Sequence, residues 1–170
     1  MAKLIRNRKV VEDSWRLLPP DATVEQAAEG DSIVPLSLWK SSREALIAAA
    51  GSGRLGVWLD GADEPGDIVA DLDRFTIVAV RAAKFGDGRI NSSGRLLRER
   101  YGYKGELRAF GELLRDQLLM LERCGFDAFV LRDSENLEDA LAAFGEFSDQ
   151  YQVSAQEPQP LFRRRLAAGR

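Results

Sequence analysis

The 170-residue sequence predicts a single α/β domain with a mainly parallel sheet and alternating βα units, arranged as an open sheet or a partial barrel. Residues 55–59 (LGVWL) and 75–80 (FTIVAV) are continuous apolar runs, which are typical of strands covered on both faces. Amphipathic segments of helical length lie between the later strand-like runs, and helical crossovers join parallel strands. A chain of this length also fits one hydrophobic core.

The first 30 residues are expected to form an N-terminal extension or a hairpin. Short apolar runs flank Asn7 and Arg8, and another run precedes Pro19. This spacing is typical of short strands joined by tight turns. The next segment, residues 21–33, is predicted to be a loop.

From residue 34 onward, strand-like and helix-like segments follow one another. Residues 34–39 are predicted to be extended, and the Ser-Ser-Arg-Glu sequence at 41–44 opens a helix that ends at the glycines 51 and 53. The remaining predicted elements are strand 55–59, a loop with a short segment, strand 75–80, helix 92–101, strand 106–110, helix 112–123, strand 127–131 and helix 136–148. The last two helices each carry one apolar stripe, so each is expected to cover a face of the sheet. Residues 154–170 are expected to form a flexible tail.

The composition removes several kinds of cofactor site from consideration. The chain contains one cysteine and no histidine, whereas an iron–sulfur cluster or a structural zinc site needs about four thiolate or imidazole ligands. Because the chain has no histidine, it also cannot form a histidine-ligated haem site or a Ser-His-Asp or Cys-His arrangement. We therefore expect no metal and no resident cofactor, and a colourless protein.

The charge balance and the cysteine count indicate which partners and which compartment to expect. The chain has 24 Lys and Arg against 27 Asp and Glu, a net charge of −3. No attraction of the whole molecule to nucleic acid or to an anionic membrane is expected. The lone Cys124 and the absence of an apolar signal core at the N-terminus favour the cytoplasm.

The segment KFGDGRINSS at residues 84–93 is the clearest candidate site. It follows a predicted strand, and ligands of parallel α/β sheets gather at the carboxyl ends of the strands. Its glycines permit close backbone approach, and the start of the next helix offers free N–H groups to an anion. We expect a small oxyanion (sulfite, sulfate or a phosphate group) to bind there with Arg89 as the principal cation. Asp87 is an opposing charge unless it turns away to cap local N–H groups or to pair with Arg89, and such a pair would partly neutralise Arg89. The candidate oxyanion-binding residues are Arg81, Lys84, Asp87, Gly88, Arg89, Ser92 and Ser93.

A purely structural interpretation of the same segment remains open. In it, the loop is a glycine turn, Asp87 bonds local backbone, and Ser92 or Ser93 caps the helix. No catalytic residue is assigned in either interpretation.

The stretch FGDGR and the run LLRERYGYKGELRAFGELLRDQLLMLERCGFDAFVLRD at residues 96–133 resemble the bacterial DUF934 family. The resemblance covers most of residues 30–152, including WLDGADEP and FSDQYQ. It implies a link to assimilatory sulfite reduction, because genes of this family commonly accompany the haemoprotein component of sulfite reductase and the members are often labelled probable oxidoreductases. The family usually continues DGR with glycine, an aromatic residue and serine, whereas Ile90 and Asn91 precede Ser92 here. A left-handed conformation is costly for Ile90, so a reshaped loop or an altered ligand affinity is expected.

The expected function is that of an accessory protein of assimilatory sulfite reduction, which binds a small oxyanion or docks to the sulfite reductase haemoprotein component. Sulfite reduction needs a cofactor that holds electrons, and this chain lacks the ligands for a histidine-ligated haem or an iron–sulfur cluster. One alternative is an enzyme, either an oxidoreductase with an externally bound flavin or nicotinamide cofactor or a lyase or isomerase that uses Asp and Lys. The other is a purely structural interaction module. The oligomeric state is left open.

Overall fold

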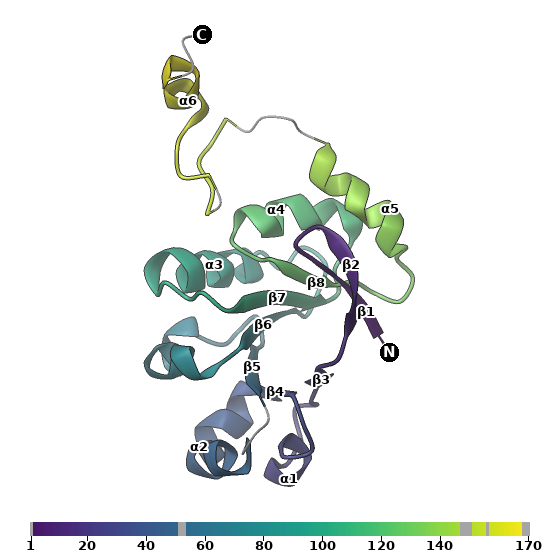
Figure 1. Ribbon diagram of the computed structural model, residues 1–170, viewed down its shortest axis with the longest axis vertical. Coiled ribbons are helices and arrows are strands. Elements are labelled where there is room, and N and C mark those ends of the chain that lie inside the picture. The colour runs from purple at the N-terminus through teal and green to yellow at the C-terminus, as the bar shows by residue number, and fades with distance from the viewer. Residues whose placement is uncertain (1, 51–53, 147–150, 156, 168–170) are drawn as a thin grey trace.

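The computed structural model describes residues 2–50, 54–146, 151–155 and 157–167, which form one α/β unit around a curled eight-stranded sheet (Figure 1). The strand order is β2-β1-β8-β7-β6-β5-β4-β3. The strands are β1 (Ala2–Arg6), β2 (Lys9–Asp13), β3 (Arg16–Leu17), β4 (Ser32–Pro35), β5 (Leu55–Leu59), β6 (Ile77–Ala82), β7 (Glu106–Gly111) and β8 (Ala128–Val130). Neighbouring strands from β3 to β8 are parallel, whereas β1 is antiparallel to both β2 and β8. The sheet is therefore mostly parallel but mixed.

The helices surround the outer side of the curled sheet, except for α6, which stands apart from it (Figure 1). They are α1 (Val24–Ala27), α2 (Leu36–Ala50), the 3-10 helix η1 (Pro65–Arg74), α3 (Arg89–Arg95), the π-helix η2 (Leu96–Arg100), the 3-10 helix η3 (Arg115–Gln117), α4 (Leu118–Arg123), α5 (Leu137–Leu141), the 3-10 helix η4 (Ala142–Gly145) and α6 (Leu161–Ala167). None of the helices in the described part of the chain combines the length and the apolar character needed to cross a membrane.

The connection between the two edge strands requires the sheet to curl. β2 and β3 lie at opposite edges, yet only Ser14 and Trp15 separate them in the sequence. A flat sheet of this order would hold its edges roughly 34 Å apart, at about 4.8 Å per strand. Three successive residues reach at most about 11 Å. The sheet therefore closes into a half-barrel in which the end of one edge strand meets the start of the other.

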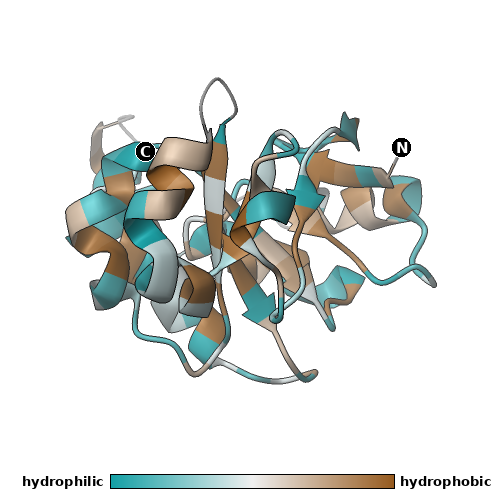
Figure 2. Ribbon diagram, turned by 90° about the horizontal axis from the view of Figure 1, so that it is seen from below, coloured by the Kyte–Doolittle hydropathy of each residue, from teal (hydrophilic) through white to brown (hydrophobic). Residues whose placement is uncertain are grey.

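Side chains alternate along the strands between two hydrophobic cores. Val57, Val78 and Leu107 lie on the outer face, in the main core that the helices cover. The inner face of the half-barrel carries a second, smaller cluster of Ile33, Trp58, Ile77, Ala79 and Phe110, with Trp15 and Val130 packed against it. Figure 2 shows hydrophobic residues along the strands and alternating hydrophobic and hydrophilic residues on the surrounding helices. The continuous apolar runs in the sequence thus belong to strands that are covered on both faces.

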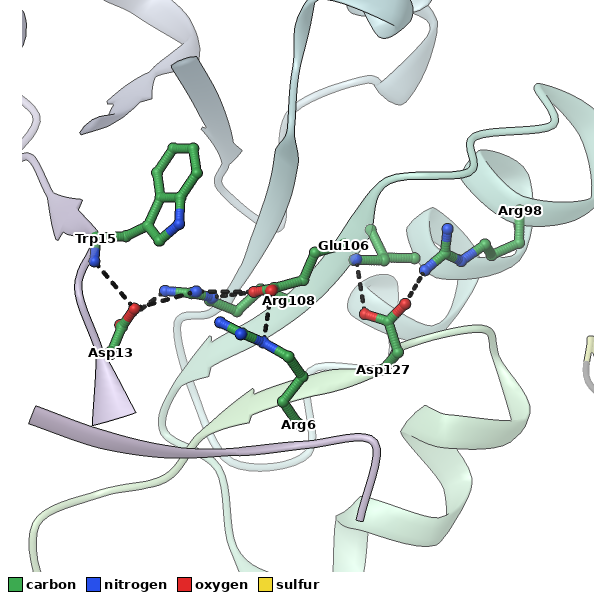
Figure 3. A network of polar contacts seen from close by, with 8 residues as sticks. Arg6, Asp13, Trp15, Arg98, Glu106, Arg108 and Asp127 are labelled. Atoms are coloured by element: carbon green, nitrogen blue, oxygen red, sulfur yellow. Dashed lines mark hydrogen bonds and ion pairs between the residues drawn. The ribbon is translucent and has the colours of Figure 1, made fainter. Parts of the chain in front are cut away.

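The inner face also holds a buried network of charges (Figure 3). Arg108, on β7, is only 2% exposed. Its guanidinium contacts Asp13 at the end of β2 (Nη1 to Oδ2, 2.8 Å) and Glu106 on its own strand (Nε to Oε1, 2.8 Å). Arg6 on β1 pairs with the other oxygen of Glu106 at 2.8 Å. Because each buried charge has an opposite partner, the network fixes the N-terminal hairpin across the inside of the half-barrel.

The four predicted parallel strands are confirmed. Predicted strands 55–59, 75–80, 106–110 and 127–131 correspond to β5, β6, β7 and β8, with ends that differ by up to two residues. Strict alternation of strands and α-helices is not found, because the 3-10 helix η1 joins β5 to β6.

Two predictions for residues 21–39 are wrong. Residues 34–39 are not one extended segment, since β4 ends at Pro35 and α2 begins at Leu36. Leu36 and Trp39 lie three residues apart and are both buried, as the inward face of a helix requires. The predicted loop 21–33 contains α1, which begins with a capping box between Thr23 and Gln26, and also the start of β4.

The predicted helices differ from the structure mainly at their ends. Predicted helix 92–101 begins earlier, at Arg89, and continues as η2, whereas predicted helix 112–123 begins only at Arg115. Gly111 has a φ of +105°, which turns the chain away from β7 before that helix can start. Predicted helix 136–148 corresponds to α5 and η4 up to Gly145; residues 147 and 148 lie outside the described residues.

Candidate functional site

Charged side chains of opposite sign meet where the parallel strands end. Asp60 directly follows β5 and lies beside Arg81 of the neighbouring β6, with Arg81 Nη1 3.2 Å from Asp60 Oδ2. Glu112 follows β7 in the same way and pairs with Arg132 at 3.1 Å. Since ligands of α/β sheets bind outside these strand ends, this edge is the natural place for a functional site.

The predicted loop supplies a third pair at the same edge. Arg89 donates from Nε to Asp87 Oδ1 at 2.9 Å and from Nη2 to Asp87 Oδ2 at 2.7 Å. The backbone N–H of Arg89 adds a contact to Oδ1 at 3.2 Å. These hydrogen bonds lower the pKa of Asp87 from 3.8 to about 2. The Arg89 side chain is nevertheless 60% exposed, so Asp87 fixes a guanidinium that still faces solvent.

Gly61 lies between the Asp60–Arg81 pair and the Asp87–Arg89 pair. Its N–H donates to Asp60 Oδ1 at 2.6 Å, and a Cβ atom on Gly61 would lie 3.0 Å from Asp87 Oδ2 and 3.7 Å from Arg89 Nη2. Hydrogen bonding to Asp87 and, less strongly, the charge of Asp60 raise the pKa of Arg89. Asp60, Arg81, Asp87 and Arg89 therefore form one group of alternating charges, which we call the edge cluster.

Five of the seven predicted site residues gather at this cluster. Arg81, Asp87 and Arg89 belong to it, Gly88 connects the last two, and the exposed Lys84 is near enough for its charge to lower the pKa of Asp87.

Ser92 and Ser93 do not join the cluster as predicted. They lie inside α3, whose N-cap is Gly88 with no side-chain cap, so the prediction that one of these serines caps the helix is wrong. Ile90 and Asn91 occupy the first turn of α3, and neither has a positive φ. The strain expected at Ile90 is therefore absent, and its side chain is buried in the main core.

Asp60 and Gly61 are site residues that the sequence interpretation missed. The available signal was position: Asp60 directly follows the apolar run 55–59, by the same criterion that selected Arg81. A carboxylate at such a position can orient a neighbouring arginine, as Asp60 does with Arg81.

A cavity of about 180 Å³ opens on the α4 side of the loop. Its lining residues are Gly86, Asp87, Gly88, Ile90, Asn91, Asp116, Gln117, Met120 and Leu121. Two carboxylates face this cavity and no arginine or lysine lines it. An anion is therefore better accommodated at the exposed guanidinium of Arg89 than inside the cavity.

Cys124 lies outside the edge cluster. Cys124 is buried, and burial raises the pKa of its thiol, so a reactive thiolate is disfavoured. Within the described residues, no group of three or more Cys, His, Asp or Glu side chains is positioned to hold a metal ion. The arrangement of the edge cluster is suited to binding a charged group.

A comparison with protein families agrees with the resemblance found in the sequence. The model of a family described as "Bacterial protein of unknown function (DUF934)" matches residues 56–162, more than half of the chain. The chain belongs to this family. The DUF934 region contains β5 except for its first residue, all of β6 to β8, and every residue of the edge cluster. No curated protein matches the chain.

Proposed function

We propose that this DUF934 protein is an accessory protein of assimilatory sulfite reduction that binds a small oxyanion at the edge cluster. The observation that carries the proposal is the arrangement of Arg89, whose Nε and Nη2 are held by Asp87 while the side chain stays exposed. A guanidinium has five donors in a rigid fork. The Nη1 group is thus left to donate to an oxyanion in a fixed orientation.

The charges around Arg89 support an anionic ligand of low charge. Arg81, Lys84 and Arg89 supply three cations beside the carboxylates of Asp60 and Asp87, and the carboxylate of Asp63, which accepts the N–H of Asp60, balances the third. Arg81 uses Nη1 for Asp60, which leaves its remaining N–H groups available on the same edge. The free N–H groups of the exposed Arg81 and Arg89 favour one small oxyanion, and the nearby carboxylates keep the affinity moderate.

The sulfite context comes from membership of DUF934 and the gene neighbourhoods that the resemblance implies. Electron transfer to sulfite requires a redox cofactor, and the residues of this chain offer no ligand set for a histidine-ligated haem or an iron–sulfur cluster. We therefore assign the protein a binding role beside the haemoprotein component of sulfite reductase, to which it docks.

Calorimetric titration with sulfite, sulfate and phosphate tests the oxyanion site. Wild-type protein should bind at least one of them with a millimolar or lower Kd. A hydrogen bond to a charged group contributes about 1.5–3 kcal/mol, so Arg89→Ala should weaken binding by about 10- to 150-fold. Arg132→Ala is the matched control, because Arg132 is an exposed, ion-paired arginine at the same edge but outside the cluster.

Two results would contradict the proposal: no saturable millimolar binding by the wild type, or equal binding by wild type and Arg89→Ala. The proposed docking to the sulfite reductase haemoprotein component is tested by gel filtration of a mixture of the two proteins, which should elute together. Separate elution at micromolar concentrations of both proteins would contradict it.

A further inference from the structure

A second hollow at the carboxyl edge lies on the other side of Asp60. A cavity of about 300 Å³ opens where β4 and β5 end and α2 begins, and we call it the β4–β5 cavity. Its lining residues are Pro35, Leu36, Ser37, Lys40, Trp58, Asp60 and Asp63. Small-molecule sites start at about this volume, so the cavity fits a ligand of modest size.

The two sides of the β4–β5 cavity carry opposite charges. Ser37 and Lys40 come from the first turns of α2, and Asp60 and Asp63 from the loop after β5. Asp63 accepts the backbone N–H of Asp60 through Oδ2 at 2.8 Å, which leaves Oδ1 for another donor. The cavity thus presents a hydroxyl and an ammonium on one side and carboxylate oxygens on the other.

Lys40 is available to a ligand even though it has a partner. Its Nζ contacts Asp67 at 2.5 Å, but the two side chains are 52% and 41% exposed, and Asp67 does not line the cavity. Exposed ion pairs are weak and exchange with water. An ammonium also has three donors, so Lys40 can keep this contact and still donate into the cavity.

Trp58 gives the cavity a rigid apolar wall. The residue is buried, its ring meets Phe110 edge to face at 5.8 Å, and its Nε1 donates to the carbonyl of Leu18 at 2.9 Å. The indole N–H is already used, so Trp58 offers a ligand only apolar surface. Pro35 and Leu36 extend that surface.

We infer that the β4–β5 cavity binds an α-amino acid. Among the residues lining this cavity, the two carboxylates of Asp60 and Asp63 outnumber the single ammonium of Lys40, which disfavours an inorganic oxyanion, and a simple amine would face the positive charge of Lys40. A zwitterion satisfies both sides: its carboxylate accepts from Lys40 and Ser37, its ammonium donates to Asp63 and Asp60, and its side chain packs on Trp58. This site shares Asp60 with the edge cluster, but its cation is Lys40 rather than Arg81 or Arg89, so it does not require an oxyanion to be bound there.

Calorimetric titration with matched probes tests the zwitterion requirement. The probes are L-alanine, L-leucine and L-methionine, together with propionate, which lacks the ammonium, and ethylamine, which lacks the carboxylate. At least one amino acid should bind with a millimolar Kd, and both truncated probes should bind at least about tenfold more weakly. The inference is overturned if none of the three amino acids shows saturable binding up to about 50 mM, or if propionate or ethylamine binds equally well.

Three variants test which side chains hold the ligand. Asp63→Asn keeps an acceptor for the N–H of Asp60 but removes the charge, and Lys40→Met keeps the aliphatic stem. Each should weaken amino-acid binding by at least about tenfold. Asp67→Asn, which removes only the exposed partner of Lys40, should leave binding unchanged or tighter.

Unchanged binding in both Asp63→Asn and Lys40→Met overturns the assignment, and so does a loss in Asp67→Asn as large as in Lys40→Met. None of the three residues belongs to the edge cluster, so titration of each variant with sulfite separates a failure here from a failure of the oxyanion site. Thermal melts of the three variants confirm that each one folds.

Discussion

The carboxylate of Asp87 has two opposing effects on its neighbour Arg89. It fixes the guanidinium through two hydrogen bonds, and it cancels one positive charge beside the place where an oxyanion would bind. The sequence predicted that the negative charge of Asp87 opposes an anion at Arg89, but it did not predict the geometry of the hydrogen bonds between the two side chains. FGDGR shows that an acid and a base lie two residues apart, but only the turn at Gly86, with a φ of +81°, decides whether they face one another.

The lowered pKa of Asp87 predicts how the loop contributes to stability at acid pH. Hydrogen bonds from Arg89 lower this pKa from 3.8 to about 2, so the carboxylate stabilises the folded protein while it is ionised. The contribution is fully present above about pH 4 and is lost as the pH falls towards 2. Asp87→Asn should therefore lower the free energy of unfolding at pH 6, and its difference from wild type should shrink below about pH 4 and be mostly lost at pH 2.

Urea unfolding at pH 6, 4, 3 and 2 measures this difference, with Asp133→Asn as an exposed control outside the edge cluster. A difference between wild type and Asp87→Asn that stays constant across this range would show that the ion pair with Arg89 does not cause the effect.

The elements that the sequence predicted best are those whose pattern is set by burial. Residues 55–59 are buried throughout β5, so their apolar run marked the strand correctly. The prediction failed at residues 34–39 because the apolar run continues from the end of β4 into the first turn of α2, and hydrophobicity does not mark the boundary. η1 gave only a weak signal, since Pro65 and Gly66 at its start are typical of a loop.

Arg98 holds the π-helix η2 to the sheet. Its Nε donates to the carbonyl of Gly125, and its Nη1 donates to the carbonyls of Tyr103 and Gly105, each at 2.8 Å. Its Nη2 contacts Asp127 at 2.5 Å, as Figure 3 shows. Arg98→Ala would leave all four acceptors without this donor. We expect a loss of about 3 kcal/mol in the free energy of unfolding. This value is near the lower end of the cost of breaking a buried ion pair, because Asp127 is partly exposed.

Arg95→Ala is the matched control for Arg98→Ala, because Arg95 lies three residues earlier and forms an exposed ion pair with Glu99. The control should cost less than about 0.5 kcal/mol. Urea unfolding at neutral pH measures both variants. Equal losses in the two would mean that the hydrogen bonds of Arg98 contribute no more than a surface ion pair.

The arrangement of the whole molecule could be predicted only in part. Local patterns indicated strands near the N-terminus, and β1 and β2 do form an antiparallel hairpin. No local pattern shows that β1 also pairs with β8, where Ile5 lies opposite Phe129. This pairing is set by long-range packing and by the two-residue connection from β2 to β3, which forces the sheet to curl.

The ion pairs of Arg108 join the N-terminal hairpin to β7. Removing the Arg108 side chain should therefore lower the stability of the whole molecule. Arg108→Met would leave Asp13 buried without its arginine, although Glu106 would still contact Arg6. The expected cost is about 3–5 kcal/mol in the free energy of unfolding, as for other broken buried pairs. Replacing Asp13 as well, in Arg108→Met/Asp13→Leu, removes the uncompensated charge and should recover at least half of that loss.

A double-mutant cycle measured by urea unfolding tests this coupling, with Arg115→Met as the control at an exposed ion pair with Glu146. The control should cost less than about 0.5 kcal/mol. A strongly favourable coupling energy between positions 13 and 108 would show that opposite charges fix the hairpin across the inside of the half-barrel. Additive losses at the two positions would instead show that Arg108 stabilises the fold by filling space. In that case the stability lost on replacing Arg108 would not be recovered by also replacing the carboxylate of Asp13.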